Sequence, residues 1–220
     1  SAGTQVAGVI AVFGEEGYYK DKIAAALPRA VFGDAALEDR EITVFERDTD
    51  IKEVSAAVNT YPFFSGRSLV IIKDEKLWGG KDGGEKRKQQ QEELAELLAD
   101  VPEHCQVLLL GEKIDKRGKL YKSLLKTAAM VECKSLKSYQ LKPWLDEQAA
   151  LRGCRFDYEA SQTIMEYLSV TDNAPLLLLE QEIEKLSVYA GERKIWTKDD
   201  IEQTFAALPE VSRFALLNAI

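Results

Sequence analysis

The chain has 220 residues, 45% of them hydrophobic, and its 37 acidic against 29 basic residues give a formal net charge of −8. This composition is typical of a globular protein with one large or two modest cores, and it excludes a disordered or fibrous chain. The acidic balance argues against bulk electrostatic adhesion to nucleic acid.

Short apolar runs alternate with helical patterns through the first two thirds of the chain. The expected strands are residues 9–13, 42–45, 69–72, 106–110 and 130–133, and the expected helices are residues 18–27, 51–58, 91–98 and 119–127. A polar loop at residues 79–88 precedes the third helix. Short buried strands separated by helices predict an open, mainly parallel sheet with helices on both faces. We therefore expect an α/β domain.

The pattern changes near Ser135, beyond which only helical periodicity is found. The expected helices are residues 141–151, 158–168, 174–189 and 197–208, and the sequence at 197–200 predicts a capping box. We therefore expect an α/β domain over residues 1–138 and a small all-helical domain over residues 139–210.

Both ends of the sequence suggest part of a longer protein. The chain begins Ser1-Ala2-Gly3 without a methionine, as a tag remnant would. Residues 211–220 begin an apolar helical pattern that has no cap or breaker. We expect this helix to lead to a C-terminal domain that is missing.

Secretion, membrane insertion and metal binding are not expected. No apolar run approaches the roughly 20 residues that span a bilayer, and the N-terminus lacks a secretory signal, so we expect a cytoplasmic protein. Cys105, Cys133 and Cys154 lack metal-ligand spacing and fit buried, reduced thiols better than disulfides or a zinc site. Because His104 is the only histidine, hydrolytic triads based on histidine are nearly excluded.

The first strand-to-helix turn resembles a phosphate-binding loop that has lost its chemistry. In the template Gly-x4-Gly-Lys-[Ser/Thr], the glycines let backbone amides approach phosphates and the hydroxyl holds magnesium. Gly14 and Lys20 match, but Tyr19 replaces the second glycine and Asp21 replaces the hydroxyl. The intervening Glu15-Glu16 pair adds repulsion, roughly 4 kcal/mol for unit charges about 4 Å apart at an effective dielectric of 20. We expect no ATP or other cofactor here.

Two adjacent phenylalanines stand just before the third expected strand. Phe63 and Phe64 follow Tyr61 and Pro62, and neighbouring side chains on a strand or helix do not face the same core. At least one ring is then exposed or committed to a partner, and aromatic pairs make good interface anchors. The alternative is a short turn that buries both rings under a neighbouring helix.

A basic run and an acidic pair complete the candidate sites. Apart from Asp115, the charged residues from 113 to 126 are Lys113, Lys116, Arg117, Lys119, Lys122 and Lys126. Such a run faces phosphates or an acidic partner, or is a solvated helix face. Asp74-Glu75 follows the third strand as in a nucleotide site, but Lys73 interrupts the pattern and favours a solvated strand end. No nucleophile has a recognisable setting, so we expect no catalytic site.

Several segments form a series with a characteristic order and spacing. They are residues 13–16, 59–70, 110–122, 131–134 and 141–145. Together they resemble the delta subunit family of the bacterial DNA polymerase III clamp loader. The resemblance implies an AAA+ module without ATPase activity, a helical lid domain and a C-terminal collar domain, the last of which we expect to be missing.

The resemblance also implies a site and partners. In the family, the apolar pair before the third strand inserts into a hydrophobic pocket of the ring-shaped sliding clamp. Here that role falls to Phe63 and Phe64, with Tyr61 and Pro62 shaping the approach. A leucine or similar aliphatic often occupies the first position of the pair, so the double phenylalanine is a modest departure.

The implied function is to help open the clamp for loading on primed DNA. The chain would be a non-catalytic subunit of a bacterial DNA-directed DNA polymerase holoenzyme, a nucleotidyltransferase complex, and other loader subunits would hydrolyse ATP and bind through the collar. Primer-template DNA would be contacted only within the assembled loader. Two alternatives stay open: a phosphate-loop-derived nucleotide-binding enzyme that uses Lys20 and Asp74, and a DNA-binding module.

Overall fold

The computed structural model describes residues 8–47, 49–73, 84–169 and 174–205, which form two compact units. The first unit ends at Lys134 and the second begins at Ser135, whereas the sequence placed the boundary between residues 138 and 139. The Asp74-Glu75 pair, the first half of the loop expected at 79–88 and the helix start expected at 211–220 lie outside the described residues. The end of the expected loop is wrong, because a helix already begins at Glu85. None of the described helices is long and apolar enough to cross a membrane.

The first unit contains a five-stranded parallel sheet with the strand order β2-β3-β4-β1-β5. Its strands are β1 (Val9–Phe13), β2 (Glu41–Phe45), β3 (Ser68–Ile72), β4 (Cys105–Gly111) and β5 (Ala128–Glu132). Apolar runs of this length suit the central strands β3, β4 and β1, which are buried almost throughout, whereas the edge strands β2 and β5 are largely exposed. The predicted α/β fold is confirmed.

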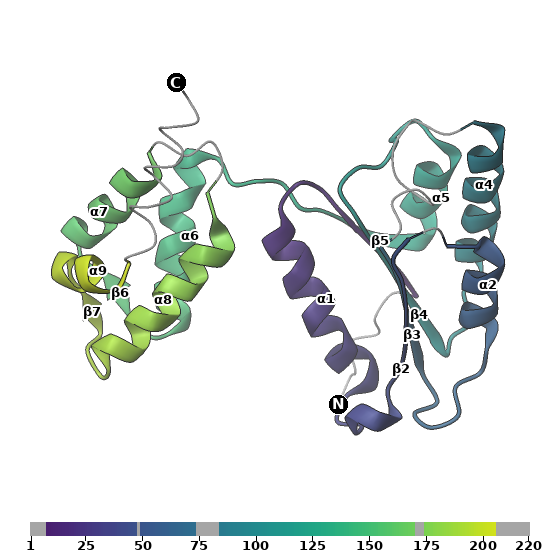
Figure 1. The fold of residues 1–220 in the computed structure, drawn as a ribbon, viewed down its shortest axis with the longest axis horizontal. Coiled ribbons are helices and arrows are strands. Elements are labelled where there is room, and N and C mark those ends of the chain that lie inside the picture. Colours follow the sequence, from purple (N-terminus) through teal and green to yellow (C-terminus); the bar gives the residue numbers. More distant parts are fainter. Residues whose placement is uncertain (1–7, 48, 74–83, 170–173, 206–220) are drawn as a thin grey trace. The chain divides into compact units, whose positions relative to one another are not determined.

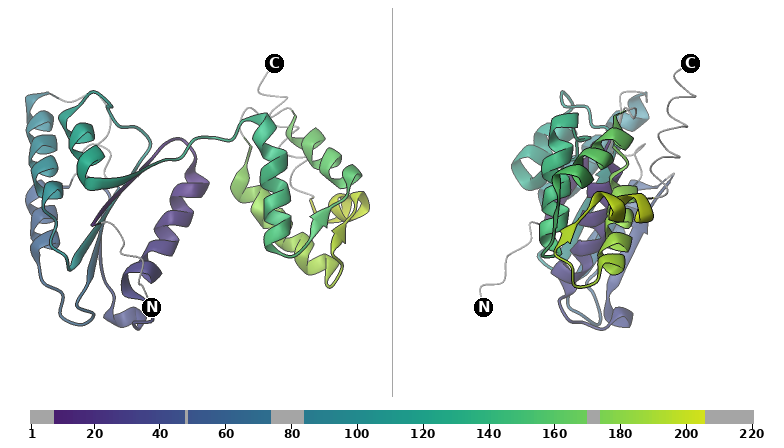
Figure 2. Two further views of the ribbon diagram at one scale, coloured as in Figure 1. Left: turned by 180° about the vertical axis from the view of Figure 1, so that it is seen from behind. Right: turned by 90° about the vertical axis from the view of Figure 1, so that its left-hand side faces the viewer.

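Helices cover both faces of this sheet (Figures 1 and 2). Helix α1 (Gly17–Phe32) packs on the face that carries Val12, Leu69 and Leu108. The other face carries Ala11 and Val70. It packs against helices α2 (Ile51–Asn59), α4 (Glu85–Ala99) and α5 (Lys119–Thr127). Because successive side chains of a strand point to opposite faces, one strand supplies both cores.

Helix α1 is longer than the pattern predicted. The predicted helix ended at Leu27, and the next residue, Pro28, has no N–H to donate and usually breaks a helix. The helix instead continues to Phe32, and Val31 and Phe32 are buried against the sheet. Burial of these two side chains offsets the loss of one hydrogen bond at the proline.

The second unit is mainly helical. It contains α6 (Ser138–Leu151), α7 (Tyr158–Leu168), α8 (Leu176–Ala190) and α9 (Lys198–Thr204), and two strands, β6 (Arg155–Phe156) and β7 (Ile195–Trp196), that pair in parallel. The buried rings of Phe156 and Trp196 meet edge to face at 5.2 Å between centroids. The sequence predicted only helices here, because two residues are too few to show strand alternation.

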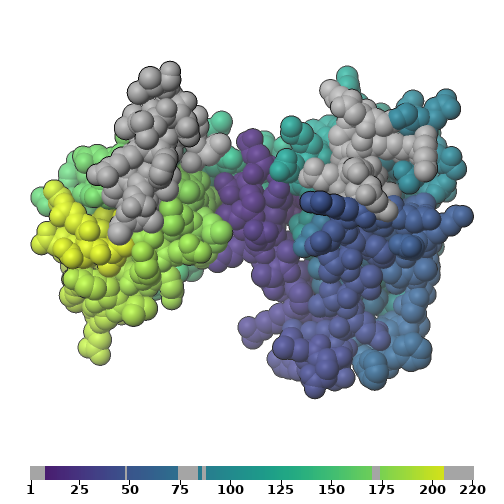
Figure 3. Space-filling view, in the orientation of Figure 1, coloured from purple at the N-terminus to yellow at the C-terminus, as the bar shows by residue number. Residues whose placement is uncertain are grey.

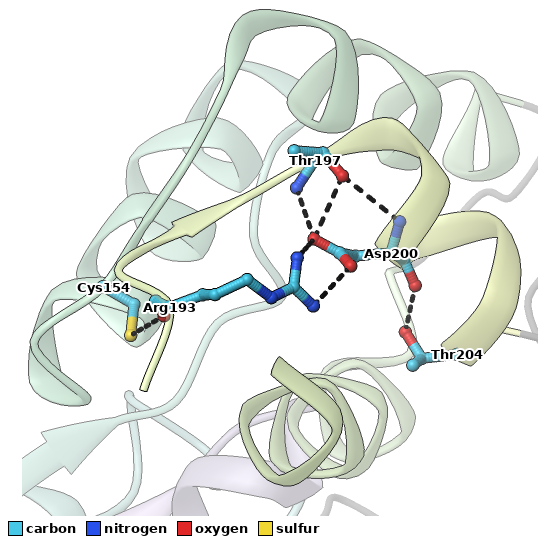
Figure 4. Close-up of polar contacts among 5 residues, drawn as sticks. All are labelled: Cys154, Arg193, Thr197, Asp200 and Thr204. Atoms are coloured by element: carbon cyan, nitrogen blue, oxygen red, sulfur yellow. Dashed lines mark hydrogen bonds and ion pairs between the residues drawn. The ribbon is translucent and has the colours of Figure 1, made fainter. Parts of the chain in front are cut away.

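The predicted capping box at the start of α9 is confirmed (Figure 4). The Asp200 carboxylate accepts a hydrogen bond from the Thr197 backbone N–H at 2.9 Å, and the Thr197 hydroxyl accepts one from the Asp200 N–H at 3.5 Å. Arg193 donates to both Asp200 oxygens, at 2.8 and 2.7 Å. These bonds, led by the Arg193 pair, hold the pKa of Asp200 below its ordinary value.

Candidate functional site

The two main candidate sites lie at opposite ends of the parallel strands, one at the carboxyl edge of the sheet and one at its amino edge. The phosphate-loop segment (residues 14–21) follows β1 at the carboxyl edge, where ligands of open α/β sheets bind. The aromatic turn (residues 61–64) precedes β3 and therefore lies at the amino edge. The aromatic turn is thus outside the usual ligand crevice of such a fold.

The aromatic turn presents its rings to solvent. Helix α2 stops at Asn59, where the N–H and hydroxyl of Thr60 both donate to the Ala56 carbonyl at 3.0 and 2.7 Å. Pro62 is buried, whereas 88% of Phe63 and 74% of Phe64 is exposed. The alternative in which a helix buries both rings is therefore wrong. Tyr61 is also 68% exposed, so the turn gathers three exposed aromatic residues.

Two residues from neighbouring strand starts contact this turn. Both oxygens of the Glu41 carboxylate accept the Phe63 backbone N–H, at 2.9 and 3.1 Å. The Tyr61 ring lies 5.1 Å from the His104 ring between centroids, at an interplanar angle of 60°. Neither contact was predicted from the sequence. Their only sequence signal is that Glu41 opens β2 and His104 directly precedes β4, at the edge where the turn enters β3.

The end of the turn is fixed locally. The Ser65 hydroxyl donates to the Arg67 carbonyl at 2.7 Å, and Gly66 adopts a φ of +65°, which a residue with a Cβ rarely adopts. Beside the turn, between β2 and α2, lies an open hollow of about 430 Å³ whose walls include Arg40, Thr43 and Ala57. In Figure 3 the lower margin of the first unit has the blue colours of this part of the chain, and atoms of the same colours continue up the visible face of the unit.

The phosphate-loop segment is packed tightly against the ends of β4 and β5. Gly14 has a φ of +127°, and a Cβ at this position would lie 2.0 Å from the Cys133 carbonyl oxygen. The Gly14 N–H donates to the Glu112 carbonyl at 3.0 Å, and the Glu16 N–H donates to the Cys133 carbonyl at 3.1 Å. These two amides therefore already have protein acceptors.

The remaining features of this segment are also used within the chain. The Glu16 carboxylate caps α1 by accepting the Tyr18 N–H at 3.0 Å, so a negative charge already occupies the helix N-terminus that attracts phosphate. The Lys20 ammonium lies 2.8 Å from the Gly14 carbonyl oxygen and 3.4 Å from that of Gly111. Tyr19 packs against the core on the α1 side of the sheet, while Asp21 is exposed.

Half of the basic run is paired with acidic side chains of the same unit. Lys116 lies 2.9 Å from Glu132, Arg117 lies 3.6 Å from Asp115, and Lys119 lies 2.7 Å from Glu92. The Lys116 hydrogen bond lowers the pKa of Glu132 and raises that of Lys116. The other members, Lys113, Lys122 and Lys126, are exposed.

No group of three or more His, Cys, Asp or Glu side chains that could hold a metal ion occurs within the described part of the chain. All three cysteines are free thiols. Burial raises the pKa of Cys105 and of Cys133, which lowers the reactivity of both thiols. Cys154 is only half-buried, contrary to the expectation that all three are buried.

The chain is similar in sequence to a known protein. The chain is 29% identical to DNA polymerase III subunit delta of Bacillus subtilis (strain 168) over 215 residues, which cover 96% of this chain and 60% of the relative. The chain therefore spans about 60% of the length of this curated relative.

Two solved structures are similar in fold to this chain. The Bacillus subtilis DNA clamp loader delta protein matches with a TM-score of 0.70 at 25% identity, over 90% of this chain and 58% of that one. A chain of the E. coli MS115-1 HORMA:CdnC:Trip13 complex matches with a TM-score of 0.55 at 13% identity, over 91% of this chain and 74% of that one, which concerns the fold alone. The family model of the DNA polymerase III delta subunit matches residues 13–134, more than half of the chain, and the chain therefore belongs to the DNA polymerase III delta subunit family.

Proposed function

We propose that this chain binds the sliding clamp of a bacterial replication machinery through the aromatic turn and helps to open the ring for loading on primed DNA. The observation that carries the proposal is the exposure of Phe63 and Phe64, 88% and 74%, on one anchored turn. Exposed adjacent aromatic rings are costly in water and are the residues that dominate interface hot spots. An apolar pocket on the partner would bury both rings.

Binding by itself does not open a ring. A subunit shifts the clamp from closed to open only if it binds the open form more tightly. The chain would act as a wedge that favours a clamp shape in which one interface does not close. The proposed role is therefore mechanical, and it fits a cytoplasmic subunit that works beside other loader subunits.

We also propose that this chain neither binds nor hydrolyses ATP and that it is a non-catalytic subunit. Support comes from the phosphate-loop segment, where Glu16 caps α1 and the Lys20 ammonium contacts two carbonyl oxygens. A phosphate would have to displace these contacts and approach the Glu16 carboxylate, which repels it. Energy from ATP would then enter through other subunits, assembled through a collar domain.

Contact with primer-template DNA is a lesser part of the proposal. All six basic residues of the run are exposed, and three of them, Lys116, Arg117 and Lys119, are paired with carboxylates of their own unit. A run this short, half of it paired, supplies a weak electrostatic footprint on an acidic chain. We therefore place DNA contact only within an assembled loader.

The decisive experiment is capture by the sliding clamp of the same organism. Wild-type protein is compared with the double variant Phe63→Ala, Phe64→Ala and with a control, Tyr139→Ala, Tyr158→Ala, which removes two aromatic residues that are 78% and 76% exposed in the second unit. Wild type and control should be captured, and the aromatic-turn variant should not. Equal capture of all three proteins would refute the proposal.

A further inference from the structure

We propose that Glu41 is a positioning residue that holds the aromatic turn in its exposed conformation before any partner binds. This inference rests on the proposed function of that turn. Glu41 opens β2, 22 positions before Phe63 in the sequence, and nothing in the motif around the phenylalanines points to it.

The contact joins a side chain of the edge strand to the backbone of the turn. Both Glu41 oxygens lie within hydrogen-bond distance of the Phe63 N–H, at 2.9 and 3.1 Å. The acceptor is charged, and charge-assisted hydrogen bonds are stronger than neutral ones. Because the bond is to the backbone, it restrains the chain at Phe63 itself and leaves the ring unobstructed.

A restraint of this kind is needed because exposed rings tend to turn back onto their own domain. Phe63 itself lines the neighbouring hollow of about 430 Å³, together with Glu41, Arg40 and Thr43, so a ring that turned further into the hollow would bury against charged and polar groups. Pro62, which is buried, limits the backbone on one side of the bond, and the Tyr61 ring contacts His104. Glu41 therefore completes a set of anchors at the base of the rings.

Positioning affects binding through the fraction of molecules that are ready to bind. The apparent dissociation constant of a partner equals the intrinsic constant divided by the competent fraction. Loss of the Glu41 contact would lower this fraction in the free chain, while partner contacts would restore the turn in the complex. The effect should therefore be slower association with little change in dissociation.

The test compares Glu41→Ala and Glu41→Gln with Glu46→Ala. Gln keeps one oxygen that accepts the Phe63 N–H, whereas Ala removes both. Glu46 is an exposed carboxylate just beyond the other end of β2, paired with Lys73 at 3.4 Å, so its replacement changes the net charge equally. The readouts are amide hydrogen exchange of Phe63 in the free protein, association and dissociation rates with the cognate sliding clamp, and melting temperature.

In Glu41→Ala we expect the Phe63 amide to exchange about fivefold faster and the clamp to associate about fivefold more slowly. Glu41→Gln should fall between this variant and wild type, and Glu46→Ala should match wild type, all at similar melting temperatures. Unchanged Phe63 exchange in Glu41→Ala would overturn the inference. If wild type itself fails to bind the clamp, the proposed function fails, whereas the exchange data still decide whether Glu41 orders the turn.

Discussion

Replacing each phenylalanine of the aromatic turn separately should show how much each ring contributes to the free energy of clamp binding. Full burial of a phenylalanine side chain is worth about 1.5 to 3 kcal/mol. Since Phe63 is 88% and Phe64 is 74% exposed, almost all of that free energy is still available for binding. The expected losses are about 1.3 to 2.6 kcal/mol for Phe63→Ala and about 1.1 to 2.2 kcal/mol for Phe64→Ala.

These free energies convert to measurable affinity changes, because each 1.4 kcal/mol is tenfold. Phe63→Ala should weaken clamp binding by about 10- to 80-fold and Phe64→Ala by about 6- to 40-fold. The double variant should lose between about 50-fold and several thousand-fold, with some departure from additivity because the rings are neighbours. Calorimetric or surface-based titration with the cognate clamp covers this range.

The folded chain should tolerate both changes. Substitutions of exposed side chains usually alter stability by less than about 0.5 kcal/mol, so urea unfolding of each variant should match wild type. Affinities of both single variants within about twofold of wild type would refute the reasoning, because rings that reach a pocket cannot be removed without loss. A parallel loss of stability would instead assign the rings to the fold.

Three further predictions concern the rest of the chain. Calorimetry with ATP and magnesium should show no saturable binding to wild type or Lys20→Ala, while Lys20→Ala lowers unfolding free energy by about 1 kcal/mol because its carbonyl contacts are lost. Gly14→Ala should cost at least about 3 kcal/mol in urea unfolding, since its Cβ would lie 2.0 Å from the Cys133 oxygen. Asp200→Asn should cost about 2 kcal/mol at pH 7. Because the Asp200 pKa is lowered in the folded protein, its stabilisation is present above the ordinary pKa of about 3.9 and is lost as the pH falls through the lowered pKa, so the difference between wild type and variant should shrink as the pH falls below about 4.

The α/β fold was predictable because its strands are short apolar runs that local pattern alone identifies. Val9–Phe13 and residues 69–72 have no period that suits a helix. The first run lies between Gly8 and Gly14, and the second lies between Ser68 and Lys73. The capping box at Thr197 was predictable for the same reason, since its partners lie three residues apart. Exposure of the phenylalanines followed from their adjacency, but only to the extent that one ring had to leave the core.

The anchors of the aromatic turn could not be predicted because they are long-range. Glu41 reaches Phe63, and His104 reaches Tyr61, only after the sheet places the starts of β2, β3 and β4 side by side. The hydrogen bonds of the Lys20 ammonium could not be predicted for a similar reason, since one of its acceptors is the carbonyl of Gly111 at the end of β4. A motif shows which residues are present, whereas their partners depend on strand order.

The phosphate-loop segment and the aromatic turn lie at opposite ends of the strands, so the state of one does not depend on contacts with the other. At the carboxyl edge, Glu16 and Lys20 satisfy the groups that would otherwise recognise a phosphate. At the amino edge, Glu41 and Pro62 anchor a turn whose rings are exposed without any ligand. Since the anchors of the turn belong to its own unit, the turn needs no nucleotide in this chain to be presented, and clamp binding need not supply the free energy of ordering it. In the proposed function, the rings would then contribute their burial to holding the clamp in one shape, which is the condition for shifting it from closed to open.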